Sequence, residues 1–96
     1  MQKYELTKET IEVNGRTLYR IRRLSDGLLG GYIESENNLS QEGSCFVYDQ
    51  AKVSGSAYVC DSARLCDSVE VSGDAFVGGS TWLLGSTLLG GSTIRI

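Results

Sequence analysis

Histidine is missing from this chain of 96 residues, and with it the side chain that enzymes use most often as a general base. The chain does contain three cysteines, Cys45, Cys60 and Cys66, but no CxxC pair and no Cys/His spacing of the kind that binds zinc. Their number is odd, and the repeat described below explains why Cys60 and Cys66 stand six residues apart. The sequence therefore predicts neither a zinc site nor a disulfide framework.

Long apolar segments and low-complexity tracts are also absent from the sequence. The N-terminal stretch MQKYELTKET has no apolar signal-peptide segment, and no apolar run approaches the roughly 20 residues that a membrane-spanning helix needs. Hydrophobic residues make up 41% of the chain and charged residues 22%, which is typical of a folded protein. We expect a single domain over residues 1–96, located in the cytoplasm.

Charge is divided unevenly along the chain, although the formal net charge is only −3. Residues 1–24 hold six basic and three acidic residues, whereas residues 25–96 hold three basic and nine acidic ones. The protein is therefore expected to have a basic N-terminal part and an acidic remainder.

A six-residue repeat fills the second half of the chain without an insertion. From Val47 the hexads read VYDQAK, VSGSAY, VCDSAR, LCDSVE, VSGDAF, VGGSTW, LLGSTL and LGGSTI. The first position is always Val or Leu and the fifth is Ala, Val or Thr, so these two columns form the expected interior. The third position is always Gly or Asp, which tolerate turn conformations, and is the expected corner. Strands this short and one-sided must bury their inner face on the next coil of a solenoid.

An aliphatic residue followed four positions later by a small one resembles the left-handed parallel β-helix of the hexapeptide-repeat acyltransferase superfamily. The resemblance implies three hexads in each triangular coil, with neighbouring coils about 4.8 Å apart. We expect an all-β fold, with a β-hairpin cap over residues 1–24, a loop and irregular first coil over residues 25–46, and the β-helix over residues 47–96. Leu39 and Cys45 continue the fifth-position spacing upstream.

The dipeptide Asn14-Gly15 lies between two β-rich segments and predicts a type I′ hairpin that covers the first coil. The expected register pairs Ile11 with Leu18, Glu9 with Arg20, and Glu12 with Thr17. Four arginines form a candidate basic face for nucleic acid or an acidic protein: Arg16, Arg20, Arg22 and Arg23. The alternative is a solvated hairpin face whose arginines are matched by glutamates, which is the commoner arrangement.

The outward positions change from polar to apolar along the repeat. The sixth positions form three ladders: Lys52, Glu70 and Leu88; Tyr58, Phe76 and Ile94; Arg64 and Trp82. No acidic residue follows Asp74, and contiguous apolar surface usually marks an interface. We expect a self-association surface, in a homodimer, made of Phe76, Trp82, Leu84, Leu88, Ile94 and Ile96. The alternative is that some of these side chains fold back over the corners.

Catalysis is not expected of this chain. The acyltransferases that the repeat resembles use a histidine as general base, and related zinc enzymes bind their metal through histidines. The aspartates of the repeat are explained by the corners, and Cys60 and Cys66 have no neighbouring base to activate them. We therefore assign no catalytic, metal-binding or cofactor-binding residue and expect no cofactor.

The order KYELT, LYRIR, LGGYIESENNLSQEG and then a run of hexads is similar to that of small phage and prophage hexapeptide-repeat proteins labelled YdcK-like, whose role is unknown. The resemblance implies a bacteriophage protein in a bacterial host cell. We hypothesise a non-enzymatic protein-binding module that self-associates and inhibits a host protein of a bacterial defence or regulatory complex. Two alternatives stay open: a structural or assembly component of a phage particle, and a nucleic-acid mimic or binder. Nucleic acid is the less favoured partner, and no membrane contact is expected.

Overall fold

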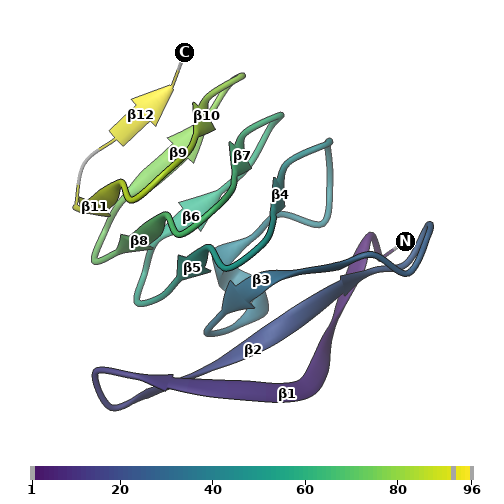
Figure 1. The fold of residues 1–96 in the computed structure, drawn as a ribbon. Coiled ribbons are helices and arrows are strands. Elements are labelled where there is room, and N and C mark those ends of the chain that lie inside the picture. Colours follow the sequence, from purple (N-terminus) through teal and green to yellow (C-terminus); the bar gives the residue numbers. More distant parts are fainter. Residues whose placement is uncertain (1, 92, 96) are drawn as a thin grey trace.

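The computed structural model describes residues 2–91 and 93–95, which form an antiparallel hairpin followed by a β-solenoid of about three turns (Figure 1). The hairpin consists of β1 (Tyr4–Val13) and β2 (Arg16–Arg23). The first coil contains β3 (Leu29–Ile33), the short 3₁₀-helix η1 (Glu36–Asn38) and β4 (Phe46–Val47). The later coils contain β5 (Lys52–Val53), β6 (Tyr58–Val59), β7 (Arg64–Leu65), β8 (Glu70–Ser72), β9 (Phe76–Gly78), β10 (Trp82–Leu83), β11 (Leu88–Gly90) and β12 (Thr93–Arg95).

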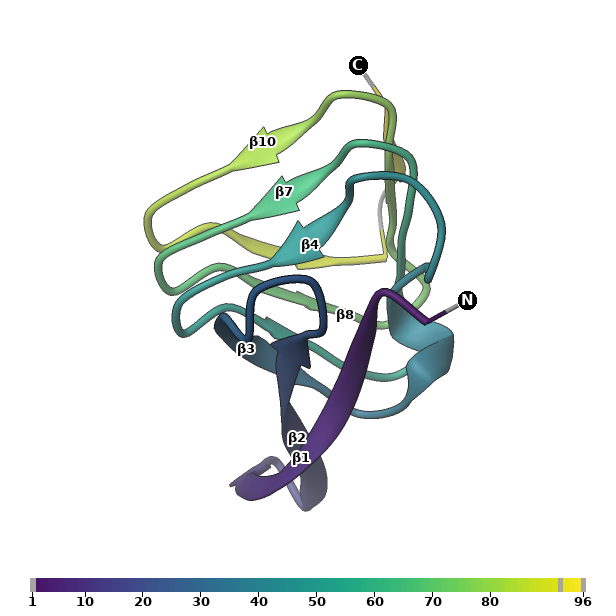
Figure 2. The ribbon, with the colours of Figure 1, turned by 90° about the vertical axis from the view of Figure 1, so that its right-hand side faces the viewer.

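Three sheets form the three faces of the solenoid. Their strand orders are β1-β2-β3-β5-β8-β11, β10-β7-β4 and β12-β9-β6. Within the repeat the strands are parallel, and Lys52, Glu70 and Leu88 lie beside one another, as do Arg64 and Trp82 on the second face. Figure 2 shows β4, β7 and β10 stacked in this way. The predicted hexad register is thus confirmed from Val47 to Gly90.

The corners are made by third-position residues with left-handed backbone. Asp49, Asp61 and Asp67 have φ values of 57°, 60° and 54°, which a short polar side chain tolerates better than most. Each carboxylate also accepts a backbone N–H from the next coil: Asp49 from Asp67 at 3.0 Å, Asp61 from Gly79 at 2.8 Å, and Asp67 from Gly85 at 2.9 Å. The corner aspartates therefore connect successive coils as well as shaping their own turns.

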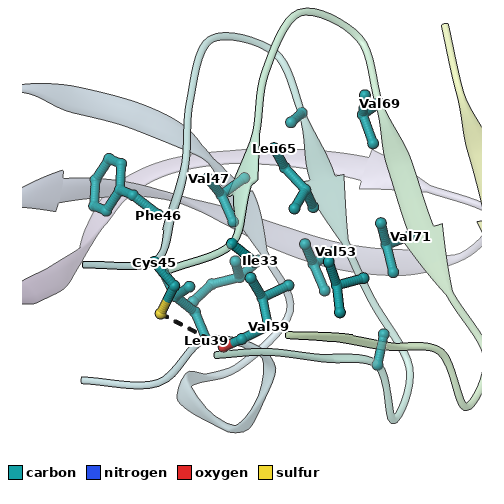
Figure 3. Packing of buried hydrophobic residues seen from close by; sticks show 14 of the residues in the cluster. Ile33, Leu39, Cys45, Phe46, Val47, Val53, Val59, Leu65, Val69 and Val71 are labelled. Atoms are coloured by element: carbon teal, nitrogen blue, oxygen red, sulfur yellow. Dashed lines mark hydrogen bonds between the residues drawn. The ribbon is translucent and has the colours of Figure 1, made fainter. Parts of the chain in front are cut away.

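The core is a column of inward first- and fifth-position side chains (Figure 3). Val47, Val53, Val59, Leu65, Val71 and Val77 are at most 1% exposed. Cys45 continues the column into the first coil, and its thiol donates to the carbonyl of Val59 at 3.7 Å. Leu39 is also fully buried, but it pairs with Val59 and so occupies a first position. Its predicted fifth-position place is wrong, because the first coil departs from the six-residue spacing between Leu39 and Cys45.

The hairpin both extends a sheet and covers the base of the solenoid. Its register confirms the pairs Ile11–Leu18 and Glu12–Thr17. Glu9 and Arg20 are not partners in the ladder, which is irregular between Leu6 and Thr10, but their side chains form an ion pair at 3.2 Å. A bulge between Leu6 and Thr10 interrupts the ladder and bends the ribbon. As a result Tyr4 and Ile21 reach the solenoid core and are fully buried, and the Tyr4 hydroxyl donates to the Leu39 carbonyl at 2.6 Å. The open ends of the strands, rather than the hairpin tip, cover the first coil.

The last strand departs from the hexad register. Thr93 lies beside Phe76, and Ile94 lies beside Val77. The predicted outward ladder of Tyr58, Phe76 and Ile94 is therefore wrong at its last member, because Ile94 stands at the level of an inward residue. The preceding corner has no further described coil stacked on it, and its Gly91 has φ of 101°, compared with 64° at Gly73 below it.

Candidate interaction surfaces

The C-terminal end of the solenoid exposes an open core. We call this surface the end face: it comprises Leu83, Leu89 and the outer edges of β10, β11 and β12, each the last strand of its sheet. Leu83 and Leu89 point inward but are only half-buried, whereas Leu65 and Val71, one coil below, are 0% and 1% exposed. Within the described residues nothing covers the end face, so apolar side chains and strand edges meet solvent together.

Apolar side chains also form a belt around the last coils. Trp82, Leu84 and Leu88 are 59%, 52% and 73% exposed. Phe76 is half-buried beside Tyr58, with ring centroids 5.9 Å apart. Phe76, Trp82 and Leu88 come from β9, β10 and β11 on three different faces, so the structure does not gather them into one flat patch. Ile94 is half-buried, and Ile96 lies outside the described residues.

Charged residues are scarce at the end of the solenoid, where Arg95 of β12 stands alone among the described residues that follow Asp74. None occurs between Asp74 and Arg95, and the whole chain lacks proline. Natural proteins usually protect exposed strand edges with lysine, proline or a bulge, because bare edges pair with other strands. The end face has no lysine or proline of this kind, which makes it the strongest candidate for an interface.

The four hairpin arginines are all engaged in ion pairs. Arg16 pairs with Glu34 at 2.9 Å, Arg20 with Glu9 at 3.2 Å, Arg23 with Asp26 at 2.8 Å, and Arg22 with Glu5. The guanidinium of Arg23 and the N–H of Leu28 lower the pKa of Asp26 to about 2, so this partner stays ionised at neutral pH. The candidate basic face is therefore balanced by acids, as in the alternative reading of a solvated hairpin.

Glu34 joins the hairpin tip to the second corner of the repeat, at Gly55. Its carboxylate accepts two hydrogen bonds from Arg16 and one from the Gly55 N–H at 2.7 Å. The Gly55 N–H, followed by Arg16, lowers the pKa of Glu34. Beside this junction lies a groove of about 760 Å³ whose charged lining residues are Arg16, Glu34, Lys52, Glu70 and Asp74. Because both basic and acidic side chains line the groove, it does not select anions over cations or cations over anions.

The outer face of the β4-β7-β10 sheet carries a feature that the sequence reasoning missed. Two adjoining hollows, each of about 320 Å³, have Tyr48 and Arg64 in common. One is lined by Tyr48, Asp49, Arg64, Cys66 and Trp82, and the other by Lys3, Arg23, Ser25, Ser44, Cys45, Phe46, Tyr48 and Arg64. We call the two together the aromatic trough. The sequence does hold one indication of it, because residues 18 apart stack on neighbouring coils. Counting back 18 residues from Arg64 adds Phe46 to the ladder of Arg64 and Trp82.

In comparisons with known proteins, no family model and no curated protein matches the chain. Among residues 2–91 and 93–95, no helix is long and apolar enough to cross a membrane. The functional proposal therefore depends on the surfaces of the solenoid itself.

Proposed function

We propose that this protein is a non-enzymatic, self-associating protein-binding module whose end face docks on the end face of a second copy. The open core at Leu83 and Leu89 carries the proposal, because it combines apolar surface with strand edges that no lysine or proline protects. Burying this surface removes apolar area from water and pairs backbone groups that otherwise rely on solvent. The exposed belt residues Trp82, Leu84 and Leu88 add to the rim of such an interface.

The geometry of the end face favours a second copy as its partner. A matching surface must offer three short strand edges arranged around an apolar centre, which is the shape of another solenoid end. The opposite end of this solenoid is closed, since β2 pairs with β3 and Tyr4 lies against the core. Two end faces can therefore meet tail to tail in a closed two-fold dimer, whereas head-to-tail stacking lacks a free head. This favours a dimer over the alternative of a stacked structural component of a phage particle.

A tail-to-tail dimer leaves both hairpins at its far ends, free to contact another protein. The likeness to small phage and prophage YdcK-like proteins suggests that this protein is a bacteriophage protein that meets its host-protein partner in the cytoplasm of a bacterial cell. On that basis the dimer inhibits a defence or regulatory complex by occupying a protein surface, without catalysis. The absence of histidine and the use of corner aspartates as links between coils support a non-catalytic role.

Sedimentation velocity over a range of concentrations tests the dimer. Wild type should approach twice the chain mass of 10.4 kDa, and Leu88→Lys should sediment as a monomer because it places a charge beside the β11 edge. Leu24→Lys is the matched control, since Leu24 is 44% exposed but precedes β3 at the other end of the molecule. A wild-type protein that stays monomeric throughout, or a Leu88→Lys variant that still dimerises, would overturn the proposal.

A further inference from the structure

The aromatic trough lies on the side of the solenoid, and Trp82 is its one lining residue that also stands at the rim of the proposed dimer interface. Its floor comes from the middle coil, where Arg64 and Cys66 lie between Tyr48 of the first coil and Trp82 of the third. Two strand spacings separate these outer coils, or about 9.6 Å. The indole N–H of Trp82 donates to the sulfur of Cys66 at 3.3 Å, and the side chain remains widely exposed. The hollow that these residues line, about 320 Å³ in volume, leaves room for a flat group.

Positive charge without a carboxylate partner lies next to these rings. The Arg64 guanidinium sits over the Trp82 ring, 5.7 Å from its centroid. In the described part of the chain neither Arg64 nor Lys3 forms an ion pair, whereas Asp26 pairs with Arg23. The Lys3 ammonium donates to the carbonyls of Cys45 at 2.6 Å, Gly43 at 3.3 Å and Glu42 at 3.5 Å, so it brings a fixed positive charge to the second hollow. These two cations differ from the hairpin arginines, each of which has an acidic partner.

Asp49 adds one negative charge to the first hollow, and Asp26 matches the charge of Arg23 in the second. Asp49 lines the first hollow, but one of its carboxylate oxygens already accepts the Asp67 N–H at 3.0 Å. Asp26 is bound to Arg23 through two hydrogen bonds. The trough therefore places an aromatic subsite directly beside a subsite for an anion, with Arg64 common to both.

We propose that the aromatic trough binds a nucleoside phosphate, with the base against Tyr48 and Trp82 and the phosphate at Arg64 and Lys3. A nucleotide carries a planar ring and an anion within one small unit, which matches the two subsites in order. Bases stack on aromatic side chains without strong sequence preference, and guanidinium groups bind phosphate oxygens well. The same chemistry occurs in free nucleotides and in single-stranded nucleic acid, so the two sources are separated by experiment.

Trp82 is the single tryptophan of the chain, so its fluorescence reports on the trough directly. The full chain is titrated at low salt with adenosine monophosphate and with a single-stranded adenylate octamer. Adenosine and inorganic phosphate supply each half of the ligand alone. We expect saturable quenching that is stronger with the complete nucleotide than with either half. Tighter binding of the octamer per site identifies a single strand as the ligand, and equal binding identifies the free nucleotide. Repeating the titration with Leu88→Lys excludes coverage of Trp82 by a second copy.

Two variants with the same change of charge test the position of the site. Arg64→Gln should weaken binding about tenfold or more, because a charged hydrogen-bond donor to phosphate is lost. Arg16→Gln removes an arginine outside the trough and should bind like wild type. The proposal is wrong if neither ligand gives saturable quenching at millimolar concentration, or if both variants weaken binding equally. Equal quenching by an acidic peptide of the same charge would also overturn it, in favour of a protein ligand.

Discussion

Gly73 offers a test of the corner geometry that separates backbone conformation from side-chain contact. The residue has φ of 64°, where an L-amino acid with a Cβ atom pays roughly 1–2 kcal/mol. A Cβ atom at this position would lie 3.5 Å from the Gly91 nitrogen and 3.6 Å from the Gly90 carbonyl carbon, which is ordinary contact. Space is therefore available, and the cost of substitution comes from the backbone.

The substitutions Gly73→Val and Gly73→Asn should consequently differ in stability. Valine is β-branched and rarely adopts this conformation, so we expect a loss of about 2 kcal/mol or more. Asparagine tolerates it, as Asn14 shows with φ of 52° in this chain, and should cost well below 1 kcal/mol. For a domain of this size, 2 kcal/mol corresponds to a fall in Tm of roughly 8–16 °C.

Urea and thermal unfolding followed by circular dichroism measure both variants against wild type. The explanation requires the order wild type, Asn and then Val, with similar spectra for all three folded proteins. If Gly73→Val were as stable as Gly73→Asn, the left-handed corner would not be the source of the glycine requirement, and the assigned role of the third hexad position would be refuted.

Three further changes probe the core, the cap and the junction. Leu65→Ala removes a fully buried side chain and should cost about 2–5 kcal/mol in urea unfolding; a loss below 1 kcal/mol would contradict a packed core. Tyr4→Phe leaves the Leu39 carbonyl without its donor and should cost about 1–3 kcal/mol. Burial, and then Glu36, raise the pKa of Tyr4, so wild type but not Tyr4→Phe should lose stability as pH rises above the ordinary tyrosine value. Because the pKa of Glu34 is lowered, its ionised carboxylate stabilises the fold above the ordinary carboxyl range, and this stabilisation is lost as pH falls through the lowered value. The free energy of unfolding of Glu34→Gln should therefore decline less steeply in acid than that of wild type. Identical pH curves would show that the contacts of Glu34 with Arg16 and Gly55 do not stabilise the protein.

The regular part of the fold could be predicted because each hexad repeats the same physical requirement. An inward aliphatic residue, an inward small residue and a left-handed corner recur at fixed spacing, so stacking one coil determines the next. The hairpin register was equally accessible, since Asn14-Gly15 sets the turn and thereby the pairing of Ile11 with Leu18. These are local patterns, and both are confirmed.

The remaining features depend on contacts between distant segments. β2 pairs with β3, and Tyr4 is buried against Leu39. These segments lie outside the hexad repeat, so no periodic pattern in the sequence indicates that they meet. The six-residue spacing is interrupted within a polar stretch of the first coil, so the sequence does not predict that Leu39 pairs with Val59. The aromatic trough escaped prediction for a similar reason: Tyr48 and Trp82 belong to different hexad columns and approach each other only across three stacked coils.

Isotope-filtered nuclear Overhauser measurements on an equal mixture of labelled and unlabelled protein test the proposed tail-to-tail dimer most directly. Only contacts between copies give signals in such a sample. Docking of two end faces predicts intermolecular signals from the methyl groups of Leu83 and Leu89, with weaker ones from Leu84 and Leu88 at the rim. Intermolecular signals confined to hairpin residues such as Leu24, or none at concentrations where the mass doubles, would contradict it.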